Sequence, residues 1–68
     1  MKPKTRNALL KAYTQLQQIV DDLYEASDNA LENDDFESAS LLAARADKLY
    51  EEAENLEFVI FLAYVHKV

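Results

Sequence analysis

The second half of the chain carries an apolar residue every three or four positions, and small residues alternate with large ones. Read at heptad spacing, the row is Ala39, Leu42, Ala46, Leu49, Ala53, Leu56, Ile60 and Ala63. This spacing is typical of one stripe of an α-helix that packs against another helix. Because such a stripe is unstable in water, the row predicts a long helix with a partner helix beside it.

The first half of the chain contains a matching row: Leu9, Ala12, Leu16, Ile19, Leu23, Ala26 and Ala30. Glycine is absent and the single proline is Pro3, so nothing interrupts either row. We expect one all-α domain over residues 1–68, an antiparallel helix-turn-helix hairpin. Its first helix is expected over about residues 4–32, the turn at about 33–34 and the second helix over about 35–66.

Polar residues mark the turn. Asn33 is expected in the left-handed conformation, and Asp34 is expected to cap the second helix in a capping box with Glu37. A hairpin that turns here brings residues face to face when their numbers sum to about 68 or 69, which places alanines opposite large side chains in four of seven layers. This register also predicts two ion pairs between the helices: Lys11 with Glu57 and Asp21 with Lys48.

Each helix has a second apolar row beside the first, more than a lone hairpin needs. A second stripe on both helices is typical of a four-helix bundle. We therefore expect two hairpins related by a two-fold axis in a homodimer, with their relative direction left open. The residues expected at this dimer interface are Leu10, Tyr13, Val20, Tyr24, Leu31, Phe36, Tyr50 and Tyr64.

Residues 58–65 form a run that is apolar around the whole circumference of the expected helix. It is far shorter than the roughly 20 residues of a membrane-spanning helix. A short strand is an alternative, because β-branched and aromatic residues are frequent in this run. The residues outside the first row need cover from a second hairpin or from a different protein. The partner-binding patch expected here consists of Phe58, Phe61, Leu62 and Val65.

Composition limits the chemistry available to the chain. There is no cysteine and the one histidine is His66, which leaves no disulfide, thiolate zinc site or histidine cage. The acidic turn lacks the spacing and the glycine of a calcium-binding EF-hand loop. We find no phosphate-binding loop or catalytic dyad, and predict a non-enzymatic, cytoplasmic protein without catalytic residues, metal or cofactor.

Charge is unevenly distributed along the chain, whose formal net charge is −6. Residues 1–11 carry four cations and no acid, whereas residues 21–37 carry only acids. Because an acidic chain is repelled by phosphate backbones, nucleic-acid binding is disfavoured for most of the surface. The first prediction is a regulator or adaptor that binds an unidentified protein. A third-ranked prediction is a nucleic-acid mimic that blocks a basic protein through Asp28, Glu32 and Asp34.

Short motifs occur in both apolar rows: Ala8-Leu9 with Ala12, and the run Ala46-Asp47-Lys48-Leu49-Tyr50. They resemble the Rop (repressor of primer) family of plasmid copy-number proteins, in which a similar run reads Ala-Asp-Glu-Leu-Tyr. The resemblance covers roughly residues 4–56. It implies a dimeric antiparallel four-helix bundle that binds a pair of RNA loops through its first helix.

Only part of that family's RNA-contacting set is present. Gln18 matches it, whereas Pro3, Leu10, Thr14 and Glu25 stand where the family has lysine, asparagine, phenylalanine and lysine. The alternative function is therefore RNA-loop binding at the basic end of the first helix. The residues expected to contribute are Lys4, Arg6, Lys11 and Gln18.

Overall fold

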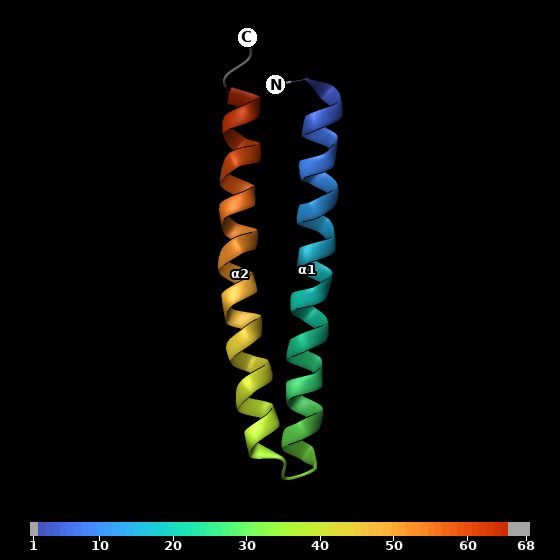
Figure 1. The fold of residues 1–68 in the computed structure, drawn as a ribbon, viewed down its shortest axis with the longest axis vertical. Coiled ribbons are helices and arrows are strands. Elements are labelled where there is room, and N and C mark those ends of the chain that lie inside the picture. The colour runs from blue at the N-terminus through green and yellow to red at the C-terminus, as the bar shows by residue number, and fades with distance from the viewer. Residues whose placement is uncertain (1, 66–68) are drawn as a thin grey trace.

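Two long α-helices make up almost all of the described chain. The computed structural model describes residues 2–65, in which α1 spans Pro3–Glu32 and α2 spans Phe36–Val65. The helices lie antiparallel in a hairpin 53 Å long, which brings the beginning of α1 beside the end of α2 (Figure 1). The all-helical hairpin predicted from the sequence is confirmed. His66, which the prediction included in the second helix, lies outside the described residues.

Residues 33–35 connect the helices, and Asp34 is the residue that reverses the chain. Its φ is 58°, in the left-handed region, whereas φ of Asn33 is −97°. The prediction that Asn33 adopts this conformation was therefore wrong by one position. Asn33 instead closes α1, since its backbone N–H donates to the carbonyl oxygens of Asn29 and Ala30.

The cap of α2 is Asp35 and not Asp34. The backbone N–H of Ser38 donates to Asp35 Oδ1 over 3.2 Å, a typical N-cap bond. Hydrogen bonds from the side chain and the backbone of Ser38 lower the pKa of the Asp35 carboxyl. The predicted N-cap is displaced by one residue because Asp34 lies in the turn. The backbone N–H of Asp35 donates to the carbonyl oxygen of Ala30, so the reciprocal bond of a capping box is not formed there.

The seam between the helices contains the whole row predicted for α2. Ala46 is completely enclosed, and every other member of the row is buried or half-buried. Small side chains at alternate positions let the two helices approach closely. No large side chain among the described residues is fully buried, so the hairpin core is thin.

The buried row of α1 differs from the prediction at two of its seven positions. Val20 is 3% exposed and Ser27 is 5% exposed, whereas Ile19 is 47% exposed. Five members of the predicted row are half-buried as expected: Leu9, Leu16, Leu23, Ala26 and Ala30. Ala12 and Ile19 are exposed, and Tyr13 and Val20 lie in the seam instead, while Ser27 is buried beside Ala26.

The predicted and the observed row of α1 both repeat every three or four residues. Their spacing alone therefore does not determine which one packs against α2. On the side of the observed row, Leu10 is half-buried beside the seam and Tyr24 stays exposed. Ser27 adds a buried hydrogen bond, because its hydroxyl donates to the carbonyl oxygen of Ala39 over 2.8 Å. This bond joins the two helices close to the turn.

Candidate interaction surface

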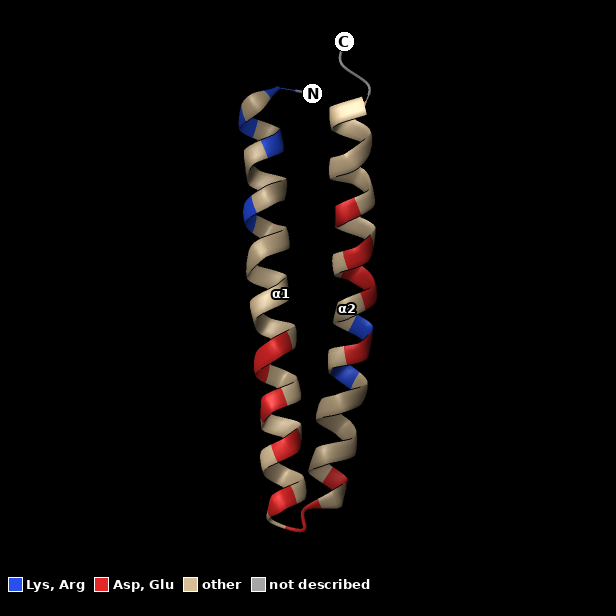
Figure 2. Cartoon of the chain, turned by 180° about the vertical axis from the view of Figure 1, so that it is seen from behind, with Lys and Arg blue, Asp and Glu red and all other residues tan. Residues whose placement is uncertain are grey.

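The four residues predicted to bind a partner lie exposed on the last turns of α2. Their exposed fractions are 62% for Phe58, 60% for Phe61, 37% for Leu62 and 57% for Val65. We call this group the terminal patch. Figure 2 shows that this end of α2 carries no charge and lies beside the basic beginning of α1, whereas acids fill the turn end.

A second apolar surface runs along one side of the seam. On both helices it consists of residues that directly follow seam residues, together with Phe36, which lies one heptad before Ala43. These residues therefore share one side of the hairpin. We call this side the tyrosine face. Its apolar members are Leu10, Tyr24, Leu31, Phe36, Ala43, Tyr50 and Tyr64. Most of them are exposed in the hairpin, and Phe36 reaches 64%.

Polar contacts cross between the helices on this face. The Tyr24 hydroxyl donates to Asp47 Oδ1, and the Tyr13 hydroxyl donates to Glu57 Oε2 over 3.3 Å. Gln17 donates from Nε2 to the Tyr13 hydroxyl over 2.9 Å. The hydrogen bond with Asp47, followed by desolvation, raises the pKa of Tyr24. Desolvation, followed by the Glu57 charge, raises the pKa of Tyr13.

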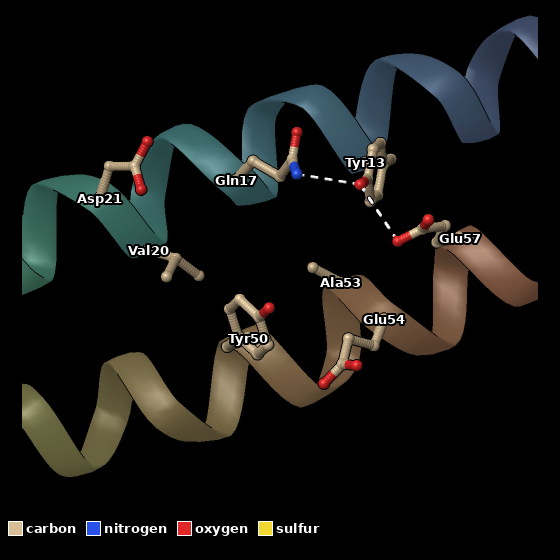
Figure 3. A pocket seen from close by; sticks show the side chains of 8 residues that line it. All are labelled: Tyr13, Gln17, Val20, Asp21, Tyr50, Ala53, Glu54 and Glu57. Carbon is tan, nitrogen blue, oxygen red and sulfur yellow. Dashed lines mark hydrogen bonds between the residues drawn. The ribbon is translucent and has the colours of Figure 1, made fainter.

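A hollow of about 190 Å³ opens in the middle of the tyrosine face (Figure 3). Tyr13 reaches it from α1 and Tyr50 from α2, while Val20 and Ala53 lie between the helices. Ala53, the smallest side chain of the lining, leaves space beside the two rings. Its remaining lining is polar and mostly acidic: Gln17, Asp21, Glu54 and Glu57.

A second, shallower hollow connects this site with the terminal patch. It is lined by Glu54, Glu57, Phe58 and Phe61. Both hollows share the two glutamates, so the tyrosine face is continuous with the part of the terminal patch that holds Phe58 and Phe61. Leu62 precedes the seam residue Ala63 and lies on the other side of α2.

The residues predicted for a dimer interface do not all lie on the outer surface. Val20 is buried in the seam, and Tyr13 is half-buried there. Leu10 is half-buried at the edge of the tyrosine face. The other five remain exposed on that face and are free to contact another chain: Tyr24, Leu31, Phe36, Tyr50 and Tyr64.

The basic residues predicted to bind RNA fall into two groups. Lys4, Lys11 and Gln18 are spaced by seven residues and lie in one exposed row on α1, where Gln18 donates to Asp22 over 3.0 Å. Arg6 lies apart, with its guanidinium carbon 5.1 Å from the centre of the Tyr64 ring, a cation–π geometry.

The two predicted ion pairs between the helices are absent. Within residues 2–65 the charged pair closer than 4.0 Å is Lys48 with Glu51, at 3.8 Å within α2. Lys48 precedes a seam residue and therefore lies on the side opposite Asp21, which lines the hollow. Glu57 bonds Tyr13, while Lys11 points along the outer row of α1.

Two further findings concern chemistry and the membrane. In the part of the chain that the structure describes, no three metal-ligating side chains lie close enough together to hold a metal ion. Over those residues, neither helix has an apolar stretch long enough to cross a membrane.

No family model, curated protein or solved structure matches this chain. The resemblance to the Rop family stays a prediction that rests on its short motifs.

Sequence reasoning missed the carboxylates of the surface. Asp21 and Glu57 were predicted to form ion pairs, and Asp47 and Glu54 were not predicted as site residues. Each of the four directly follows a seam residue of its helix. The position directly after a seam residue was the signal that could have placed these carboxylates on the tyrosine face. For Asp21 this prediction depends on recognising Val20 as a seam residue of α1.

Proposed function

We propose that this protein is a non-enzymatic interaction protein that binds another protein through the continuous surface formed by the tyrosine face with Phe58 and Phe61 of the terminal patch. The observation that carries the proposal is the exposure of large apolar side chains in one connected area. Phe58 and Phe61 line the shallower hollow, Tyr50 lines the central one, and Glu54 and Glu57 line both. Such contiguous apolar surfaces mark sites of association.

The accessible area supports this function. The hairpin exposes 5325 Å², whereas a compact monomer of 7.8 kDa exposes about 4,400 Å². The difference is close to the ~800 Å² that each partner buries in a standard interface. A partner that covers the surface would therefore give the chain the burial of a compact protein.

Site-specific photo-cross-linking tests the proposal. p-Benzoylphenylalanine placed at Phe61 in the source cells should give a discrete adduct with another protein. The matched control is the same residue at Leu41, which is 66% exposed but lies near the other end of α2. Identical adducts at both positions, or none at Phe61, would refute the proposal.

A homodimer is the second candidate for covering this surface. The sequence predicted it from the second apolar rows, and the excess area is close to the ~800 Å² that one side of a dimer interface buries. Sedimentation equilibrium over a wide concentration range tests this candidate, since two hairpins would sediment at twice 7.8 kDa. A monomer at all concentrations would exclude the four-helix bundle.

RNA-loop binding and nucleic-acid mimicry rank lower as functions. The exposed basic row of α1 holds only two lysines, and it continues at the same spacing into Glu25 and Glu32. Phosphate binding depends on the number of cations in contact, so this row supports weak and strongly salt-dependent binding. The acidic end offers charge, whereas the tyrosine face combines charge with large exposed rings and a hollow.

A further inference from the structure

The charges around the tyrosine face all have one sign over most of its length. Asp21, Glu54 and Glu57 line the central hollow, and Asp47 accepts the Tyr24 hydroxyl. Asp28 follows Asp21 by seven residues and extends the acidic edge toward the turn.

The cations of the described helices lie elsewhere. Arg45 and Lys48 precede their seam residues and flank the opposite side, while Lys4 and Lys11 lie on the outer row of α1. Arg6 is at the extreme end, over the Tyr64 ring. The middle of the tyrosine face therefore combines apolar rings with carboxylates that no lysine or arginine within residues 2–65 neutralises by an ion pair.

A second copy fits this charge pattern poorly. In a two-fold dimer the same surface patch meets itself. The carboxylates near the middle of the face, Asp21, Glu54 and Glu57, would then meet those of the other copy. Like charges across an interface disfavour association, so the pattern selects a partner of opposite charge.

The hollow indicates what such a partner inserts. Two tyrosine rings and three carboxylates surround a space of about 190 Å³. Aromatic faces attract guanidinium and ammonium groups, and carboxylates bind them through charge-assisted hydrogen bonds. The two hollows follow one side of the helical seam, a surface that a helix with one apolar stripe can cover.

We propose that the tyrosine face binds a basic amphipathic helix of another protein, whose apolar stripe covers Tyr24, Tyr50 and Phe61. An arginine or lysine of that helix enters the hollow between Tyr13 and Tyr50. This inference rests on the proposed interaction function and adds the chemistry of the partner.

The test uses two synthetic helical peptides with leucine at heptad spacing, one with arginine and the other with glutamate at the polar positions. Isothermal titration of the full chain should show binding of the leucine–arginine peptide, weakened by added salt, and none of the leucine–glutamate peptide. Equal binding of both peptides would overturn the inference, since apolar contact alone would then explain it.

Matched variants separate the site from general charge attraction. Glu54→Gln with Glu57→Gln should weaken binding of the leucine–arginine peptide about tenfold. Glu25→Gln with Glu32→Gln removes the same charge from the outer row of α1 and should leave the Kd within about twofold. Equal losses in both double variants would overturn the proposed site.

Failure of this inference is distinguishable from failure of the proposed function. If neither peptide binds but the residue-61 cross-link still forms, the interaction function stands and the basic helix is wrong. If the chain is a tight dimer that excludes the peptide, a second copy covers the face and the basic helix is again wrong.

Discussion

The seam and the tyrosine face, two apolar regions lying side by side, use opposite kinds of residue. The seam encloses small side chains such as Ala39, Ala46 and Ala53, whereas the face exposes large rings such as Phe36 and Tyr50. A monomer designed only for stability would bury the large side chains. The difference indicates that the seam determines the shape of the hairpin, whereas the rings are left exposed on its surface.

The largest effect on stability is expected in the seam at Ala46. Ala46→Leu forces a larger side chain between helices that leave no space, which should lower the free energy of unfolding by about 1–3 kcal/mol. Chemical denaturation followed by circular dichroism measures this change. Ala44→Leu, on the exposed side of α2, should stay within about 0.5 kcal/mol of the parent. Equal losses for both variants would contradict a tightly packed seam.

A smaller loss in the free energy of unfolding is expected when the buried hydrogen bond near the turn is removed. Ser27→Ala removes the donor to the Ala39 carbonyl and should cost about 1 kcal/mol. Ser40→Ala removes an exposed hydroxyl from α2 and serves as the control. If the two variants unfold at the same denaturant concentration, the Ser27 bond contributes nothing.

Removing the N-cap of α2 should lower the Tm by a small amount that depends on pH. Because hydrogen bonds to Ser38 lower the folded-state pKa of Asp35, the stabilisation is present above the unfolded value of 3.8 and is lost as pH falls through the folded pKa. The difference in Tm between the parent and Asp35→Ala should therefore be largest at neutral pH and shrink in acid. Asp28→Ala is the control, and a Tm difference for Asp35→Ala that does not change with pH would contradict the cap.

The smallest effect on stability is expected in the terminal patch. Phe61→Gln with Leu62→Gln removes exposed apolar groups and should change the free energy of unfolding by less than about 1 kcal/mol. The same variant should bind the leucine–arginine peptide about tenfold more weakly. A large loss of stability with unchanged binding would reverse the roles assigned to the two regions.

Much of this fold follows from local signals in the sequence. Without glycine and with Pro3 as the single proline, the helices have no internal stop, and the row from Ala39 to Ala63 identified the buried side of α2. The seam of α1 was ambiguous, because Leu9, Leu16 and Leu23 belong to both candidate rows. Only packing against α2 decides in favour of Val20.

Two further details, the N-cap of α2 and the central hollow, could not be predicted from residue spacing. Consecutive aspartates at Asp34 and Asp35 both suit a cap, and the backbone reversal at Asp34 assigns the cap to Asp35. The hollow depends on where the Tyr13 and Tyr50 rings lie around Ala53, and residue spacing does not predict ring positions. The terminal patch was predictable, because an all-round apolar helix cannot be covered by a single partner helix.

Sedimentation equilibrium of the full chain, alone and with the leucine–arginine peptide, tests the central claim most directly. The account predicts a 7.8 kDa monomer whose mass increases by one peptide. A concentration-independent dimer whose mass does not change when the peptide is added would contradict it, because the tyrosine face would then be covered by a second hairpin.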